Sequence, residues 1–463
     1  MLNIDKSNKI HFIGIGGIGM SAIADILIEK GYKVSGSDMN QGTMIDKLIN
    51  DGAEVFIGHN ASNVEGASLV VYTAAIGNDN PELLRARELG IETVTRAEML
   101  GMLMSNCKNS IAVAGTHGKT TTTSMLSIML KDADLDPTLL VGGNLAELNG
   151  NVRVGGTDYF VTEACEYMDS FLSLRPKIEV ILNIDSDHLD YFRDIDHIVE
   201  SFEKFTHLVP EDGMILAYSA NPFVSKAVKG LKNVKTFGLD EHCNYAALNI
   251  DFDQDGLPSY ELYCDGEKLC DIKLGIPGEY NILNSLAAIG CAHMLGVDVE
   301  VAKKTLEKYK GTQRRFDVMG VTKKGAKVID DYAHHPTEIK ATLKAAHNIP
   351  HRKLWCLFQP HTYTRTIALF DEFADAFEDA DNIVLVEIYA AREKNIHKIS
   401  SESLVPAIKA NFPDKEVCYI KEFEDIVDYV RENSCEGDLI ITMGAGDVYK
   451  IGEMILEKDE EQC

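Results

Sequence analysis

The chain has 463 residues, of which 45% are hydrophobic and 25% are charged, and its formal net charge is −27. This length predicts about two to four domains with ample buried core. The acidity argues against a nucleic-acid partner and an anionic membrane surface, because both need a basic footprint, but it leaves a phosphorylated small substrate open.

The chain carries no sign of export or membrane insertion. It has no run of the roughly 18–20 apolar residues that a membrane span needs, and its N-terminus lacks a signal-peptide pattern. Its ten cysteines are scattered; Cys264 and Cys270 flank an Asp-Gly turn and could meet, but single buried thiols are the favoured interpretation. We therefore expect a cytoplasmic protein.

The first block, residues 1–106, opens with a strand, a glycine turn and a helix. A strand from Ile10 leads into GIGGIG at 14–19, a helix is predicted over 20–29, and the next strand ends at Ser37-Asp38. A G-x-G-x-x-G turn with an acid about 20 residues later is typical of dinucleotide sites. The turn itself requires only a diphosphate at a helix N-terminus, so a sugar nucleotide also fits.

The second block, residues 107–313, begins with GTHGKT at 115–120, between an apolar strand pattern and a helical one. Glycines let backbone N–H groups approach phosphate oxygens, Lys119 adds a full charge, and the Thr120 hydroxyl can bind Mg²⁺. Val113 stands where the longer phosphate-loop pattern has its first glycine, so this is the short form GxxGK[ST]. We predict a nucleotide phosphate site.

Two acidic segments in this block are candidate metal sites. Glu163 follows the predicted strand 159–162, at the position where Mg²⁺ is usually held beside a phosphate loop; a solvated acid is the alternative. The segment 183–190 carries three acids and His188 behind a buried-type strand, which is costly unless a cation or substrate is bound there. An exposed acidic turn is the alternative, and His188 could bind a second Mg²⁺.

After about residue 245, the pattern of the second block changes to short alternating strands followed by helices. Short alternating strands between about 245 and 276 surround two Asp-Gly turns and predict hairpins. Helices are predicted over 281–295 and 299–309. The third block, residues 314–463, again alternates strands and helices, so we predict three α/β domains in series.

Polar clusters lie at the start of the third block and at its strand ends. Adjacent arginines at 314–315 could reach a γ-phosphate when domains close, although such pairs are usually solvated. Asp331 could accept hydrogen bonds from a ribose, and Arg365 could pair with a carboxylate. Ligands of α/β sheets bind at such strand ends.

These motifs resemble those of the Mur ligase family over the whole chain. The strings that carry the resemblance are GIGGIGMSAIA (14–24), GSD (36–38), NPE (80–82), TRAEML (95–100), GTHGKTTT (115–122), NIDSDHLDYF (183–192), RRF (314–316), DDYAHHPTEI (330–339), FQPHTYTR (358–365) and GAGD (444–447).

The resemblance implies a fold and a reaction. The N-terminal domain, 1–106, would be Rossmann-like and bind a UDP-sugar, the central P-loop domain, 107–313, would bind ATP, and the C-terminal Rossmann-like domain, 314–463, would bind the amino acid. The implied reaction joins L-alanine to the carboxylate of UDP-N-acetylmuramate through an acyl phosphate, with ATP and Mg²⁺, in peptidoglycan precursor synthesis.

The resemblance also implies roles for particular residues. The catalytic set is Lys119, Glu163, His188 and Arg315, and the metal ligands are Thr120, Glu163 and His188. The ATP-binding set is Gly115, Thr116, His117, Gly118, Lys119, Thr120, Thr121, Asn281, Arg315 and Asp331. The UDP-sugar set is Gly16, Gly17, Ser37, Asp38 and His59, and the amino-acid set is His335 and Arg365.

Three positions depart from the family pattern or stay open. Thr362 stands where some relatives have arginine, and Tyr280 stands where histidine is frequent. Lys204 lies near the position of a lysine that other members carbamylate.

Three other functions stay open as alternatives: a ligase adding a whole tripeptide to the same UDP-sugar, an NAD-dependent oxidoreductase, and a non-catalytic nucleotide switch.

Overall fold

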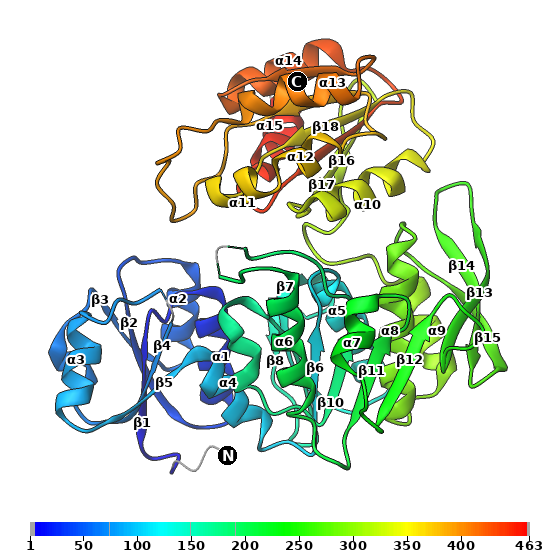
Figure 1. The fold of residues 1–463 in the computed structure, drawn as a ribbon. Helices are drawn as coiled ribbons and strands as arrows, with labels where there is room; N and C mark the ends of the chain where they lie inside the picture. Colours follow the sequence, from blue (N-terminus) through cyan, green and yellow to red (C-terminus); the bar gives the residue numbers. More distant parts are fainter. Residues whose placement is uncertain (1–4, 74, 149, 190, 461–463) are drawn as a thin grey trace.

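The computed structural model describes residues 5–73, 75–148, 150–189 and 191–460, which form three α/β domains (Figure 1). The N-terminal and central domains lie side by side, and the C-terminal domain lies above them in this view. The three-domain α/β fold is thus confirmed. The predicted boundaries after residues 106 and 313 stay a prediction; the sheets themselves are separated at 96–108 and 274–316.

The N-terminal domain is a parallel five-stranded sheet of order β3-β2-β1-β4-β5. The glycine turn links β1 to α1, which begins at Ile18, two residues before the predicted start, because extended Gly17 is its N-cap. Gly36 has to be small, since a Cβ there would lie 2.6 Å from the Ile15 side chain. The elements are β1 (Lys9–Ile13), α1 (Ile18–Glu29), β2 (Lys33–Asp38), α2 (Thr43–Asn50), β3 (Glu54–Ile57), β4 (Ala67–Tyr72), α3 (Pro81–Glu88), β5 (Glu92–Thr95) and α4 (Arg96–Met104).

The central domain is a ten-stranded sheet of order β15-β14-β13-β12-β11-β10-β6-β9-β7-β8. The predicted hairpins are confirmed, but they extend the main sheet, because β13 pairs in parallel with β12. The elements are β6 (Asn109–Ala114), α5 (Lys119–Asp132), β7 (Thr138–Leu145), β8 (Gly150–Arg153), β9 (Tyr159–Ala164), β10 (Ile178–Ile181), α6 (Ile195–Thr206), β11 (Met214–Tyr218), α7 (Pro222–Ala227), β12 (Val234–Gly238), β13 (Tyr245–Phe252), β14 (Pro258–Cys264), β15 (Glu267–Lys273), α8 (Tyr280–Met294) and α9 (Val299–Lys308).

The C-terminal domain is a six-stranded sheet of order β16-β17-β21-β18-β19-β20, parallel except for the edge strand β16. No expectation from the sequence covers β16. The elements are β16 (Asp317–Val321), β17 (Lys327–Asp331), α10 (Pro336–His347), β18 (Leu354–Phe358), α11 (Tyr363–Ala368), α12 (Phe370–Ala374), β19 (Asn382–Leu385), α13 (Leu404–Asn411), β20 (Glu416–Tyr419), α14 (Phe423–Asn433), β21 (Leu439–Met443) and α15 (Tyr449–Glu460).

One hydrophobic core runs through both the N-terminal and the central domain. Helix α4 packs against the 3-10 helix Tyr167–Ser173, so closely that a Cβ on Gly101 would lie 2.0 Å from the Ser173 carbonyl oxygen. Leu103 of α4 and Phe171 of the 3-10 helix are both buried in this core. We call this contact the apolar junction.

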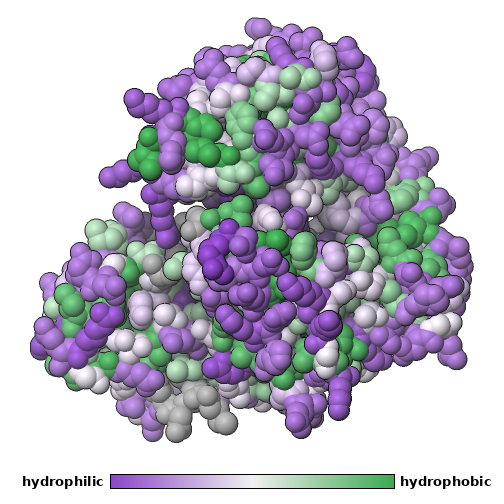
Figure 2. Space-filling model, in the orientation of Figure 1, coloured by the Kyte–Doolittle hydropathy of each residue, from purple (hydrophilic) through white to green (hydrophobic). Residues whose placement is uncertain are grey.

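The face of the molecule shown in Figure 2 is mainly hydrophilic (purple), with scattered hydrophobic patches (green). Cys264 and Cys270 are unpaired thiols, as expected, but they are half-buried rather than buried. Among the described residues, no helix is long and apolar enough to cross a bilayer.

Candidate active site

The loop 115–118 connects β6 to α5 and has the backbone of a phosphate cradle. Gly115 has φ +142° and Gly118 has φ +85°, a region that favours glycine. A Cβ on Gly118 would lie 2.4 Å from Asn284 Oδ1, so the loop also needs glycine for space. Asn183 fixes the loop from behind, because its amide accepts from His117 N (2.8 Å) and donates to the His117 carbonyl (3.0 Å).

Lys119, the first residue of α5, folds back over this loop. Its Nζ donates to the carbonyls of Gly115 (2.5 Å) and Thr116 (3.1 Å), and it lies 3.1 Å from the buried Glu166 carboxylate. Burial opposes its charge, but Glu166, together with Cys165 and Glu163, outweighs burial and raises the Lys119 pKa. Groups of the protein itself therefore hold this cation in place over the loop.

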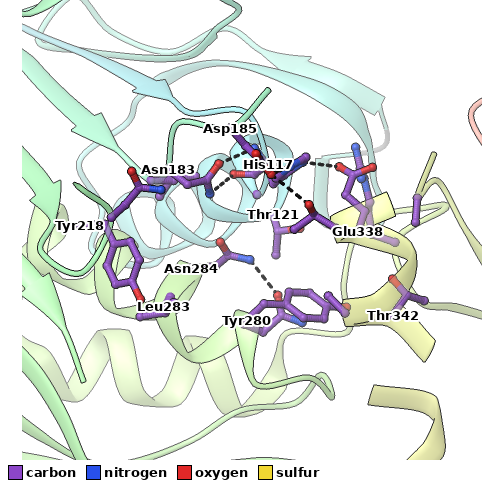
Figure 3. Close-up of a pocket in the computed structure, with 18 of the residues that line it drawn as sticks. His117, Thr121, Asn183, Asp185, Tyr218, Tyr280, Leu283, Asn284, Glu338 and Thr342 are labelled. Carbon is purple, nitrogen blue, oxygen red and sulfur yellow. Dashed lines mark hydrogen bonds and ion pairs between the residues drawn. The ribbon is translucent and has the colours of Figure 1, made fainter. Parts of the chain in front are cut away.

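Histidines, acids and hydroxyls join the central and C-terminal domains, and we call this contact the polar junction. His117 lies 3.1 Å from Glu338 of α10 and 3.4 Å from Asp185 (Figure 3). The Thr337 hydroxyl donates to Asp185 (2.9 Å), and His335 Nε2 lies 3.0 Å from the Ser186 carbonyl. A loop expected to hold phosphate thus contacts a different domain directly.

The polar junction favours a charged His117. Burial opposes the imidazolium, but the hydrogen bonds to Asp185 and Glu338 outweigh burial and raise the His117 pKa to about 9. Burial lowers the pKa of the neighbouring His335, which favours its neutral form. His117, Asp185 and His335 place ligand atoms within 4.8 Å of one another, yet a protonated His117 cannot bind a metal ion.

A cavity of about 430 Å³ opens beside the phosphate loop between the central and C-terminal domains (Figure 3). One wall is aromatic and aliphatic, which suits the flat face of a nucleobase. Polar groups from both domains also face the cavity. The lining includes His117, Gly118, Thr121, Tyr218, Phe223, Phe237, Tyr280, Asn281, Leu283, Arg315 and Asp331.

Arg315 and Asp331 reach this cavity from the domain boundary, whereas Arg314 does not line it. The Arg314 side chain is committed to Asp330 (2.9 Å) and to the carbonyls of Gly444 and Gly446. Asp331, the last residue of β17, accepts from the backbone N–H groups of Phe316 and Ala333, and burial raises its pKa to about 6. Of the two adjacent arginines, only Arg315 therefore faces the cavity.

Glu163 and Thr120 fit a site for Mg²⁺. Glu163 lies in β9, which runs two residues further than predicted, and its Oε1 accepts from Gly142 N (2.6 Å). Gly142 and Gly143 of β7 leave room here: a Cβ on Gly142 would lie 2.6 Å from Glu163, and one on Gly143 would lie 3.3 Å from Thr120 Cγ2. A carboxylate and a hydroxyl are the hard oxygen ligands that Mg²⁺ prefers.

His188 lines a different cavity from Glu163, one of about 540 Å³ that also contains Arg365. The His188 ring lies against Tyr167, with 4.6 Å between ring centroids. Arg365 Nη2 lies 2.9 Å from the buried Asp187 carboxylate. Asp190, the last acid of the predicted cluster, lies outside the described residues.

The glycine turn of the N-terminal domain leads to a second polar site. Gly16 N donates to Asp38 (2.9 Å), which places this acid beside the turn. The Ser37 hydroxyl lies 3.0 Å from His59 Nδ1 and donates to Glu82 (2.5 Å). Burial opposes the Glu82 charge, but hydrogen bonds from Ser37 and Asn63, together with His11 at 3.8 Å, outweigh burial and lower its pKa to about 2.

Four residues that support these sites carry no individual expectation from the sequence. They are Glu82, Glu166, Asn183 and Glu338, which support Ser37, Lys119, the phosphate loop and His117 respectively. Three signals were available: Glu82 stands in the NPE string, Asn183 in NIDSDHLDYF and Glu338 in DDYAHHPTEI. Their buried partners are far away in sequence, so spacing alone could not assign a function.

Known protein families match all three domains. Three Mur ligase models match in succession: the Mur ligase family catalytic domain over residues 9–108, the Mur ligase middle domain over 113–292, and the Mur ligase glutamate ligase domain over 314–446.

Individual relatives match over nearly the whole chain. The UDP-N-acetylmuramate–L-alanine ligase of Clostridium acetobutylicum is 52% identical over 99% of this chain and 99% of the relative. That of Caldanaerobacter subterraneus is 50% identical over 99% and 100%. The crystal structure of UDP-N-acetylmuramate-alanine ligase MurC from Thermotoga maritima aligns with a TM-score of 0.80 and 28% identity, covering 98% of this chain and 100% of that one.

A solved structure with another named activity is also similar. A murein peptide ligase from Psychrobacter arcticus aligns with a TM-score of 0.70 and 25% identity, over 97% of this chain and 98% of that one.

Proposed function

The chain belongs to the Mur ligase family, and from this premise we propose that it joins L-alanine to the carboxylate of UDP-N-acetylmuramate with consumption of ATP. The observation that carries the proposal is identity of 50% and 52% over nearly the full chain to ligases named for this reaction. The product would be a precursor of peptidoglycan. The free thiols at Cys264 and Cys270 fit the cytoplasm as its compartment.

The reaction proceeds in two steps. A muramoyl carboxylate oxygen attacks the γ-phosphorus of ATP, which forms an acyl phosphate and releases ADP. The amine of L-alanine then attacks the acyl carbon, and the tetrahedral intermediate expels phosphate and leaves an amide. Water would hydrolyse the acyl phosphate, so the reacting groups have to be enclosed between domains.

We assign the ATP site to the loop 115–121 and the adjoining 430 Å³ cavity. Backbone N–H groups of the loop would bind the phosphates, and Lys119 would exchange its carbonyl contacts for phosphate oxygens. Asn281 lies where the nucleobase would enter, and Arg315 and Asp331 face the nucleotide from the C-terminal side.

We assign Mg²⁺ to Thr120 and Glu163, and a second Mg²⁺ to His188. When bound, the metal would neutralise charge on the transferring phosphoryl group. The supporting observation is the space that Gly142 and Gly143 leave beside Thr120 and Glu163.

The other two substrates are assigned to the remaining polar sites. The UDP-sugar would bind at Gly16, Gly17, Ser37, Asp38 and His59, where the turn precedes α1. The amino acid would bind near His335 and Arg365. Both lower the pKa of the buried Asp187 in spite of burial, Arg365 more strongly than His335.

Phosphate release tests the proposal. The protein is incubated with ATP, Mg²⁺ and UDP-N-acetylmuramate, and phosphate is measured with L-alanine, with L-serine or glycine, or with the tripeptide. We expect release with L-alanine. Release only with the tripeptide would support the tripeptide-adding alternative instead. The matching family models argue against an oxidoreductase and a non-catalytic switch.

A further inference from the structure

Two histidines and a carboxylate meet where the phosphate loop contacts the C-terminal domain. His117 belongs to the loop, Asp185 lies after β10, and His335 is the N-cap of α10. A ligand atom from each of the three lies within 4.8 Å of the other two. His117 Nε2 lies 3.4 Å from Asp185 Oδ2 (Figure 3), and neighbouring ligand atoms of a tetrahedral zinc ion are about 3.3 Å apart. The three side chains therefore have nearly the spacing of a zinc site.

Hydrogen bonds on the far side of each imidazole ring already orient both histidines for a metal ion. His117 Nδ1 lies 3.1 Å from the Glu338 carboxylate, which leaves Nε2 for a metal. His335 Nε2 donates to the Ser186 carbonyl (3.0 Å), and its Nδ1 accepts a long bond from the Thr337 N–H (3.3 Å). Histidines that bind metals usually donate their second N–H to a carboxylate or a backbone carbonyl. Both rings have such a partner.

The charges at the polar junction also favour a divalent cation. Asp185 and Glu338 flank His117, and a protonated His117 balances only one of their two negative charges. A Zn²⁺ ion would balance both charges once it displaces the Nε2 proton of His117 into solvent. Mg²⁺ prefers oxygen ligands and would leave this proton in place, whereas imidazole is a favoured ligand of zinc. The site therefore discriminates against the metal that the reaction uses.

The three ligands come from both sides of the polar junction. His117 and Asp185 belong to the central domain and also line the 430 Å³ cavity, while His335 belongs to the C-terminal domain. The Asp185 side chain is 39% exposed, which gives an ion a path of entry, and His335 is 4% exposed. An ion bound by all three would hold the phosphate loop against the C-terminal domain.

We propose that His117, Asp185 and His335 bind Zn²⁺, and that the bound ion inhibits the protein by locking the polar junction. Zinc binding goes beyond the proposed function, because it needs no substrate. The inhibition rests on the proposed ATP site, since domains joined by an ion cannot separate to exchange nucleotide phosphates at the loop.

Calorimetric titration with Zn²⁺ in excess Mg²⁺ tests the site. We expect one ion per chain, and Asp185→Asn and His335→Gln should each weaken zinc binding at least about tenfold. Thermal unfolding without zinc shows whether each variant is folded. His347→Gln is the matched control, because exposed His347 forms another close histidine pair with His351, with 5.8 Å between ring centroids. It should leave the zinc affinity unchanged.

Phosphate release tests the inhibition. The free Zn²⁺ concentration is fixed with a chelating buffer, because ATP itself binds zinc. At free Zn²⁺ about tenfold above the measured Kd, the rate of the unmodified protein should fall about tenfold. Asp185→Asn should keep most of its own zinc-free rate, and added chelator should restore the rate of the unmodified protein.

Equal zinc affinity in the unmodified protein and in both ligand variants overturns the site. Loss of zinc binding in Glu163→Ala would place the ion at the proposed Mg²⁺ site and overturns it as well. Tight zinc binding without inhibition overturns the inhibitory role alone. Zinc binding by a protein that ligates no amino acid overturns the proposed function and leaves the zinc site intact.

Discussion

The N-terminal domain contacts the central domain through aliphatic and aromatic side chains, whereas the C-terminal domain contacts it through histidines, acids and hydroxyls. In the apolar junction, Leu103 and Phe171 belong to one continuous core. In the polar junction, His117 lies between Asp185 and Glu338. Apolar surfaces lose their stabilising contacts when the two domains move apart. Charged groups and hydroxyls can instead form new hydrogen bonds with water or substrate. The two contacts therefore predict that the C-terminal domain moves when ligands bind.

The largest effect is expected from Phe171→Ala in the apolar junction. Phe171 is 1% exposed and stacks on Phe205 with 4.4 Å between ring centroids. The substitution should lower the free energy of unfolding by about 3–5 kcal/mol. Urea denaturation measures this loss. Phe252→Ala is the control, because Phe252 is 38% exposed, and it should change the free energy of unfolding by less than about 1 kcal/mol. A loss of less than about 1 kcal/mol for Phe171→Ala would contradict a hydrophobic core shared by the N-terminal and central domains.

Lys119→Ala should lower kcat about 10²–10³-fold, because a preorganised charge at the transferring phosphoryl group is lost. It should also destabilise the fold, since Glu166 is left without its partner. Adding Glu166→Gln should restore stability but not turnover. Lys131→Ala, at the far end of α5, serves as the control. Recovery of turnover in the double variant would show that Lys119 is not required for catalysis.

Glu163→Ala should lower kcat about ten- to a hundredfold, and raised Mg²⁺ should restore part of the rate, because Thr120 remains as a ligand. Titration of the rate with Mg²⁺ shows whether the apparent metal affinity has fallen. Glu211→Ala replaces an exposed acid and should leave the titration unchanged. An identical titration for Glu163→Ala would exclude Glu163 from the metal site.

The smallest effect concerns pH at the polar junction. The His117 pKa rises from 6.5 to about 9 on folding, so its stabilising contribution is complete below pH 6.5 and is lost as pH rises through 9. We expect a loss of about 2 kcal/mol over this range, after allowance for solvent screening. Urea unfolding at several pH values should show a flatter profile for His117→Gln. Exposed His242→Gln should keep the original slope, and parallel profiles for all three proteins would contradict the assignment.

Local sequence patterns predicted the features that depend on neighbouring residues. GTHGKT specifies its own turn because its two glycines adopt positive φ and its lysine begins a helix. The glycine turn at 14–19 is likewise local, and Asp38 lies beside it because β1 and β2 are adjacent parallel strands.

The contacts between distant residues could not be predicted in this way. His117 and Glu338 are separated by 221 positions, and only the docking of two domains brings them together. The ion pair between Lys119 and Glu166 depends on the chain path after β9, and β16 forms only because β17 offers a free edge.

The contacts of Lys119 also bear on how quickly nucleotide leaves. Its ammonium is held by two carbonyls and a carboxylate before any phosphate arrives. We expect this charge to return to the same acceptors when ADP leaves the proposed ATP site, so that no unpaired cation is left in a dehydrated pocket. We therefore expect a lower barrier to ADP release, which would not require ordered water to refill the loop.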